Sequence, residues 1–245
     1  MVDFPRESCY PNEKRVVDPK GDINMLDRKY ADYAWDATAA LLAIDSPSGY
    51  TSAAAKWVQE AFAALGFDAK ITVKGGVIVD LGGADANDAL FLEAHADTLG
   101  AMVAQIKGDG RLKLTSLGGM NPNNAEAENV RVHTRDGKVI EGTCQLCNAS
   151  VHVNGDYSGA KRSWDSVEIV LDEDVKSAAD ARKLGIEVGD IVCFDPRTKR
   201  TESGYLKSRF LDDKLSVGIL LGFAKYLADN KITPTRRVYA HITVY

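Results

Sequence analysis

The chain has 245 residues, which is enough for one large domain or two smaller ones. Hydrophobic residues make up 45% of it and charged residues 27%, as is typical of globular domains. The formal net charge of -5 argues against the basic surface of a nucleic-acid-binding protein. No apolar run approaches the ~20 residues that span a bilayer. From the charge we expect no nucleic-acid partner, and from the lack of such a run we expect no membrane partner.

The N-terminal 20 residues are polar and charged and lack the apolar core of a secretory signal. One Cys-x-x-Cys pair is present, whereas a structural zinc site would need two such pairs and a redox motif would open a helix. We therefore expect reduced cysteines in a cytoplasmic protein. The four cysteines are Cys9, Cys144, Cys147 and Cys193.

The first third of the chain has the pattern of an α/β layer. Apolar residues recur at helical spacing up to Ile44, and the turn-forming run Asp45–Gly49 follows. A second helix, capped by Thr51 or Ser52, ends before Gly66. Helices followed by strands predict an α/β arrangement. The expected elements are helices over 25–44 and 51–65 and strands over 69–74, 77–81 and 89–95, the last burying Leu90 and Leu92.

Beyond Gly100 the pattern becomes that of short strands. Two segments, 103–117 and 130–145, are predicted β-hairpins that each turn at an Asp-Gly pair. Further strands are expected over 167–171 and 190–194, with a short helix over 177–184 between them. We predict a small, mostly β domain over 102–204, inserted into an α/β domain made of 1–101 and 205–245.

The last forty residues return to the α/β pattern. A helix is predicted from close to Asp212 to near Asn230. Its apolar stripe holds Leu215, Ile219, Gly222 and Tyr226, with Leu220, Ala224 and Leu227 beside it. The segment 236–245 alternates as a strand whose even-numbered residues from Val238 onwards are apolar. Because chain termini are usually exposed and loose, an apolar strand at the end of the chain leads us to expect that the sequence has been cut there.

Two motifs are candidates for the functional site: a histidine with a nearby aspartate, and a pair of adjacent aspartates. His95 and Asp97 close the apolar strand, and ligands of open α/β sheets lie beyond the carboxyl ends of such strands. Imidazole is a metal ligand, and Asp97 is suited to fix its tautomer. In the pair Asp212 and Asp213, one carboxylate can cap a helix while the other bridges two cations. The alternatives are helix capping or backbone bonding for the first motif and plain helix capping for the second.

The other histidines are weaker candidates. We expect His133 at the surface, His152 bonded to a neighbour in a strand, and His241 packed or at an edge. The chain contains no P-loop, GxGxxG, HExxH or GxSxG motif. Nucleotide, nicotinamide and serine-hydrolase functions are therefore unsupported.

An ordered set of motifs resembles the M42 metallopeptidases, the group of glutamyl aminopeptidases, tetrahedral aminopeptidases and "endoglucanases". The resemblance covers nearly all of the chain after about residue 35. It implies an α/β/α zinc-peptidase-like domain with an inserted small, PDZ-like β-barrel domain. The motifs are Asp45–Gly49, Leu92–Gly100, Leu117–Gly119, Gly185–Asp190 and Leu211–Lys214.

The resemblance implies a two-metal centre and a function. His95 corresponds to a ligand of one ion, Asp212 to the bridging aspartate and Asp97 to the catalytic aspartate that orients the histidine. Two divalent ions, zinc or cobalt, would activate water in an aminopeptidase that acts on peptide substrates. The family also implies a homo-oligomer, possibly a dodecamer. The chain departs from the family at four positions. Ala96, Thr98 and Leu99 stand where Met, Glu and Ile are common, and Lys214 stands where arginine is common.

The family's strand equivalent to 238–245 runs into a Glu-Glu pair, the first being the general base, and a further Asp and His follow. None of these is in the sequence. We therefore expect a chain that ends at Tyr245 to be inactive and to bind metal weakly. The alternatives are a related co-catalytic amidohydrolase, such as a deacylase or carboxypeptidase, and a non-catalytic paralogue that serves as a scaffold.

Overall fold

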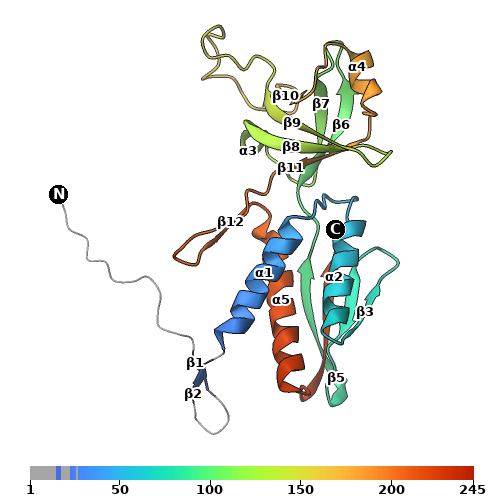
Figure 1. The fold of residues 1–245 in the computed structure, drawn as a ribbon, viewed down its shortest axis with the longest axis vertical. Helices are drawn as coiled ribbons and strands as arrows, with labels where there is room; N and C mark the ends of the chain where they lie inside the picture. The colour runs from blue at the N-terminus through green and yellow to red at the C-terminus, as the bar shows by residue number, and fades with distance from the viewer. Residues whose placement is uncertain (1–14, 18–22, 26) are drawn as a thin grey trace, which may run out of the picture.

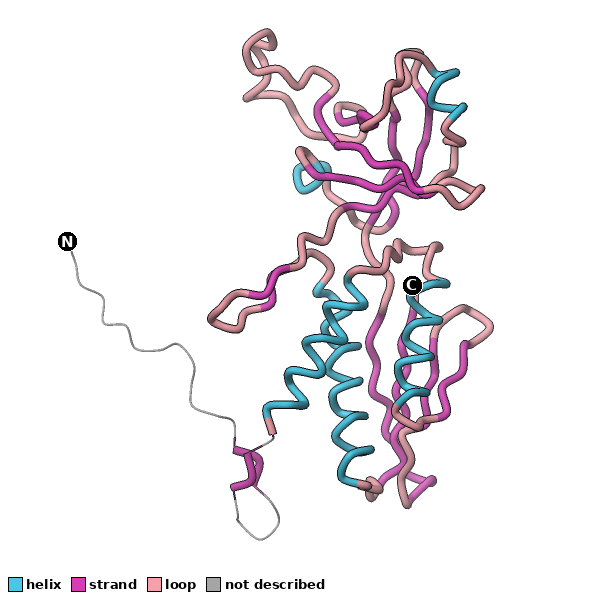
Figure 2. The backbone as a smooth tube through the Cα atoms, viewed as in Figure 1, coloured by secondary structure: helices cyan, strands magenta, loops and turns pink. Residues whose placement is uncertain are grey.

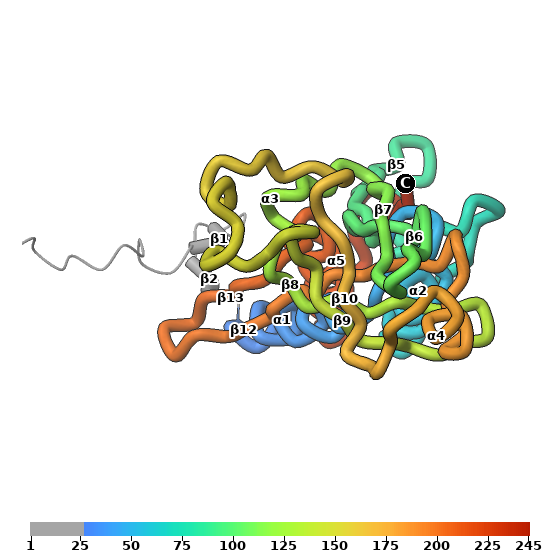
Figure 3. The backbone as a smooth tube through the Cα atoms, turned by 90° about the horizontal axis from the view of Figure 1, so that it is seen from above, coloured from blue at the N-terminus to red at the C-terminus, as the bar shows by residue number. Residues whose placement is uncertain are grey.

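The fold is that of a computed structural model, which describes residues 15–17, 23–25 and 27–245. It has two parts stacked along the long axis: a β-barrel above and an α/β layer below (Figure 1). Seen from above, the barrel strands overlie the helices of the lower part (Figure 3). The prediction about a secretory signal falls mainly on residues outside those described, and so does Cys9.

The α/β layer contains three helices and a sheet. The helices are α1 (Arg28–Leu42), α2 (Ser52–Ala64) and α5 (Leu211–Asn230). The sheet has the order β3-β4-β14-β5, in which β14 is antiparallel to β4 and parallel to β5. Its strands are β3 (Asp68–Ile71), β4 (Val77–Asp80), β5 (Asp85–His95) and β14 (Arg236–Thr243). The parallel pair matters most, because both of its strands end at the same edge.

One face of this sheet is packed against helices. Val238, Ala240 and Ile242 of β14 are buried in a core that α2 and α5 complete. The opposite face carries Phe91 and Tyr239, whose rings lie 5.4 Å apart, and Phe91 stays half-exposed. The described residues thus form two layers, the sheet and one helical layer. The second helical layer of the predicted α/β/α arrangement stays a prediction.

The upper part is a closed six-stranded barrel of order β10-β7-β6-β11-β8-β9 (Figure 2). It has its own apolar core, separate from that of the α/β layer. Its strands run from residue 100 to residue 194. They are β6 (Gly100–Ile106), β7 (Leu112–Leu117), β8 (Glu128–His133), β9 (Val139–Leu146), β10 (Val167–Leu171) and β11 (Ile191–Phe194).

Smaller elements complete the fold. The helices α3 (Pro122–Ala125) and α4 (Ala178–Lys183) belong to the barrel. The ribbon of β12 (Lys199–Arg200) and β13 (Leu206–Lys207) projects from the junction of the two parts (Figure 2). The strands β1 (Arg15–Val17) and β2 (Ile23–Met25) form another ribbon near α1. No helix among the described residues is long and apolar enough to cross a membrane.

Two predictions about burial are wrong. Leu215, Ile219 and Gly222 were expected on one stripe of α5, yet Ile219 is 55% exposed and Leu215 is exposed, whereas Gly222 is buried together with Gly218. The physical reason is close packing against α1, which glycines permit and hydrophobicity does not register. Leu90 was expected inside, but it is 39% exposed in the middle of β5, which lies at one edge of the four-stranded sheet.

Candidate metal centre

The two predicted motifs meet at the carboxyl edge of the parallel strands. His95 is the last residue of β5, and Asp212 lies in the first turn of α5, which begins beside the barrel (Figure 1). The chain enters the barrel at Gly100, five residues after His95. The candidate site therefore lies where the α/β layer meets the barrel, at the position expected for ligands of such sheets.

The ring of His95 lies between two carboxylates. Its Nε2 is 3.1 Å from Oδ1 of Asp212, and its Nδ1 is 3.2 Å from both Oδ1 and the backbone carbonyl oxygen of Asp97. The side chain of Asp97 is 14% exposed, whereas that of Asp212 is 94% exposed. Asp97 is thus the fixed partner of the ring, and Asp212 is the partner that faces solvent.

The facing atoms fit a shared metal ion. Zinc binds histidine nitrogen and carboxylate oxygen at roughly 2.0–2.2 Å, so two ligands of one tetrahedral ion stand roughly 3.3 Å apart. The observed separation of Nε2 and Oδ1, 3.1 Å, is close to that value. The donor types also suit zinc or cobalt. Because a catalytic zinc usually has three protein ligands, His95 and Asp212 alone would not complete such a centre.

Asp213 has a different partner from the one that helix capping would give it. Its Oδ2 accepts a hydrogen bond of 3.2 Å from the backbone N–H of His95, which ties the start of α5 to the end of β5. A cis peptide bond joins Asp212 to Asp213, and the residue at the N-cap, Phe210, has φ +62 and makes no side-chain capping bond. The two carboxylates therefore point to different atoms of His95, one to its ring and one to its backbone.

A second set of potential metal ligands lies in the same junction. Side-chain atoms of Asp45, His133 and Cys193 lie within 4.8 Å of one another. However, Arg131 donates to both oxygens of Asp45, at 2.8 and 2.6 Å, and His133 Nε2 is 2.8 Å from Oδ2. Burial would raise the pKa of Asp45, but these hydrogen bonds outweigh it and lower the pKa to about 2. The arrangement is that of an ion-pair network.

The network corrects the prediction that His133 lies at the surface. The side chain of His133 is 15% exposed, because β8 presents it towards the loop that follows α1. Arg131 and His133 are two residues apart and so lie on one face of the strand. That spacing was the available signal, but their partner Asp45 is more than eighty residues away. Burial raises the pKa of the neighbouring Cys193 thiol.

The remaining histidines lie away from the candidate centre. His152 falls in a turn rather than in the expected strand, and it is exposed. His241 lies on the open face of the sheet, with Nδ1 3.2 Å from Oε1 of Glu93. Three of the cysteines are described, and all are free thiols, as expected: Cys144, Cys147 and Cys193.

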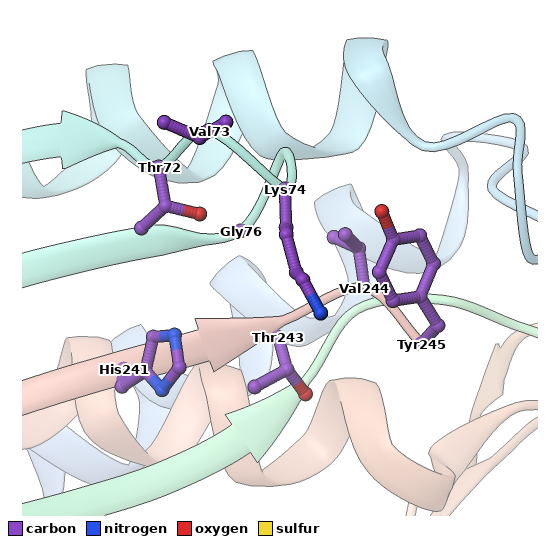
Figure 4. A pocket seen from close by; sticks show the side chains of 8 residues that line it. All are labelled: Thr72, Val73, Lys74, Gly76, His241, Thr243, Val244 and Tyr245. Carbon is purple, nitrogen blue, oxygen red and sulfur yellow. The ribbon is translucent and has the colours of Figure 1, made fainter.

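A cavity of about 350 Å³ opens beside the end of β14 (Figure 4). Thr243 lines it and is paired in the sheet with His95, so the cavity adjoins the edge that carries the candidate centre. The side chain of Lys74 extends across it towards Thr243 and Tyr245 (Figure 4). The remaining lining residues are Thr72, Val73, Gly76, His241 and Val244.

The profile of the M42 glutamyl aminopeptidase family matches residues 75–245, which is more than half of the chain. This chain belongs to the M42 glutamyl aminopeptidase family. The match includes both motifs of the candidate centre, so the resemblance inferred from the sequence is confirmed.

Individual relatives agree with this assignment. The Bacillus subtilis protein YhfE, which carries a provisional aminopeptidase name, is 44% identical over 181 residues, or 74% of this chain and 52% of its own length. Aminopeptidase APDkam598 from Desulfurococcus kamchatkensis is 25% identical, with a TM-score of 0.75 over 89% of this chain and 57% of its own. The chain thus spans about half the length of such relatives.

A third protein shows the fold alone. The TET1 peptidase of Pyrococcus horikoshii is 24% identical and superposes with a TM-score of 0.71 over 86% of this chain and 61% of its own. That protein can assemble into a tetrahedron or a large octahedral shell.

Proposed function

We propose that this chain provides part of the two-metal centre of a metal-dependent aminopeptidase that removes N-terminal residues from peptides. His95 is proposed as a ligand of one ion, Asp212 as the bridging ligand, and Asp97 as the aspartate that orients His95. The observation that carries the proposal is the convergence of His95 Nε2 and Asp212 Oδ1 to 3.1 Å at the carboxyl edge of the sheet. Membership of the M42 family supports the reaction.

Each residue has a definite task. Divalent zinc or cobalt, when bound, supplies the Lewis acid that makes water a nucleophile near neutral pH. His95 offers the lone pair of Nε2 when its proton sits on Nδ1, beside Asp97. Asp212, being exposed, offers two oxygens to neighbouring cations. The general base and the remaining ligands are proposed to lie in the part of the family's sequence that this chain does not cover.

The first test is metal content per chain, by elemental analysis of protein whose intact mass has been recorded. About two zinc or cobalt ions per chain, in protein whose mass is well above 26.5 kDa, support the proposal, and His95→Ala should reduce that content. Protein free of metal at a mass of 26.5 kDa favours the non-catalytic scaffold. Normal peptidase turnover by such a chain would contradict our expectation that it is inactive.

The second test is the choice of substrate. An aminopeptidase cleaves peptides with a free amino terminus, whereas a deacylase or carboxypeptidase of the same chemistry does not depend on it. We expect cleavage of free peptides and no cleavage of their N-acetylated counterparts. Preferential hydrolysis of N-acylated amino acids would transfer the proposal to the alternative amidohydrolase.

Three further expectations belong to the same proposal. The α/β layer is proposed to be part of a zinc-peptidase-like α/β/α domain, and the barrel is proposed to be PDZ-like. Homo-oligomer formation, possibly as a dodecamer, is supported by the shells that the Pyrococcus horikoshii TET1 peptidase forms. A cytoplasmic location is proposed from the sequence pattern alone. Sedimentation of the purified protein tests the assembly.

A further inference from the structure

The loop between α1 and α2 contacts the residue that orients His95. Ser48 donates a hydrogen bond of 2.6 Å from its hydroxyl to Oδ2 of Asp97. The other oxygen of that carboxylate, Oδ1, is the one 3.2 Å from His95 Nδ1. The carboxylate is therefore held at both oxygens, by a hydroxyl donor on one side and by the imidazole on the other.

The backbone of this loop lies along the segment that follows His95. The N–H of Thr98 donates to the carbonyl of Ser46 at 2.8 Å, and the N–H of Ser48 donates to the carbonyl of Thr98 at 3.2 Å. The hydroxyl of Ser46, which is fully buried, donates to the carbonyl of Ala96 at 2.8 Å. These bonds fix the position of the Ser48 hydroxyl relative to Asp97.

The barrel and α5 hold the same loop from the other side. Asp45 is bound by Arg131 and His133 of β8, at 2.6–2.8 Å. Lys214, buried in α5, donates from Nζ to the carbonyl of Ile44 at 2.6 Å. The loop is thus tied at its first residues to the barrel and to the helix that carries Asp212.

We propose that Ser48 is a positioning residue, which fixes the Asp97 carboxylate and through it the tautomer of His95, and that Asp45 anchors Ser48 to the barrel. The inference rests on the proposed role of His95 as a metal ligand. A histidine can ligate through Nε2 only if its proton is on Nδ1, and the partner of Nδ1 selects that tautomer. The barrel thereby influences the ligand from a separate domain.

The test uses the ring ¹⁵N chemical shifts of His95 in the metal-free 245-residue chain at about pH 8, where an ordinary histidine is neutral. His95 is assigned through its substitution by glutamine. In the wild-type chain we expect the Nδ1–H tautomer to dominate, because Nδ1 has two acceptors on the largely buried Asp97, whereas Nε2 faces the exposed carboxylate of Asp212. Ser48→Ala should increase the Nε2–H fraction, and Ser48→Thr, which keeps a hydroxyl, should restore the wild-type shifts.

Two variants separate positioning from general loosening. Ser46→Ala removes a hydroxyl from the same loop that does not reach Asp97, so it should leave the tautomer unchanged. Asp45→Asn weakens the anchor and should move the tautomer in the direction of Ser48→Ala. Cobalt titration of the same chains should show an affinity about tenfold lower for Ser48→Ala, the lower end of the loss for partners behind a ligand.

Three outcomes would overturn the inference: a wild-type chain without the Nδ1–H tautomer, unchanged shifts in Ser48→Ala, or equal changes in Ser46→Ala and Ser48→Ala. The tautomer is read without metal and without substrate. If the wild-type chain binds no cobalt, the proposed function loses its support, while the shifts still decide whether Ser48 positions His95.

Discussion

Asp45 shows how a single carboxylate can link two domains. It is half-buried, and Arg131 and His133 supply three hydrogen bonds to it. Its pKa of about 2 in the folded chain lies below the ordinary value of 3.8. The unfolded chain therefore binds the proton more readily, and the charged carboxylate stabilises the folded state at neutral pH.

We predict that Asp45→Asn lowers the free energy of unfolding at pH 7 by about 2 kcal/mol, the equivalent of the pKa difference. Because the folded pKa is the lower one, this contribution is complete above about pH 4 and is lost as the pH falls towards 2. Urea unfolding at several pH values measures it. The matched control is Asp174→Asn, in an exposed pair with Lys176, which should have almost no effect. A constant difference from pH 7 to pH 2 would contradict the assignment.

Asp212 presents the opposite case, a carboxylate that the fold does not need. It is almost fully exposed and contacts Nε2 of His95. Asp212→Asn should leave the melting temperature unchanged, because surface substitutions usually stay within about 0.5 kcal/mol. The affinity of the Asp212→Asn variant for cobalt should fall at least about tenfold, since a charged ligand is lost. Isothermal titration measures this. Asp229→Asn, at the other end of α5, serves as the control, and equal losses in both variants would refute a ligand role.

At this scale the sequence predicted the motifs but not their surroundings. His95, Asp97 and Asp212 stood out because they follow a strand or open a helix, which are local patterns. The ion-pair network around Asp45 joins residues more than eighty positions apart, and nothing local in β8 indicates that its polar face meets a carboxylate. For the same reason His133 was predicted at the surface.

The packing of α1 on α5 depends on two glycines, an arrangement that belongs to the scale of elements. A Cβ atom built on Gly218 would lie 1.9 Å from Oγ1 of Thr38 and 2.7 Å from the carbonyl of Ala34. On Gly222 it would lie 2.8 Å from Cβ of Ala34. The helices are therefore too close for any side chain at these positions.

We predict that Gly218→Ala destabilises the chain by about 1–3 kcal/mol, the usual cost of overpacking. This cost should exceed the gain of up to about 1 kcal/mol that alanine brings over glycine in a helix interior. Thermal unfolding measures the balance. The control is Ile219→Ala at the next position of the helix, where the side chain is exposed, and it should change stability little. A Gly218→Ala variant more stable than the wild type would show that the helices can separate at low cost.

Element boundaries followed from period and turn chemistry, whereas the buried face of α5 did not. The strand β14 alternates cleanly, so the burial of Val238, Ala240 and Ile242 could be predicted. Helix α5 carries apolar residues around most of its circumference, and its buried face is selected by close contact with α1. The predicted stripe included the buried Gly222 but also the exposed Leu215 and Ile219, because hydrophobicity alone does not indicate where α1 approaches.

At the scale of the molecule, the candidate centre depends on two cores that form separately. The barrel core and the core of the α/β layer are distinct clusters, joined through the strand ends, the loop after α1 and the segment before α5. A closed barrel has no unpaired sheet edge within it. The barrel should therefore not need the α/β layer in order to fold, whereas the position of Ser48 needs both.

We predict that a fragment covering residues 99–195 folds on its own. It contains all six strands of the barrel and the residues that fill its core. Circular dichroism should show strand content and a cooperative thermal transition, and proton NMR should show dispersed amide signals. Ile169→Asp places a charge at a fully buried position of that core and should abolish the transition. A fragment that stays unfolded would mean that the ion-pair network around Asp45 supports the barrel. Each domain would then depend on the other for its stability.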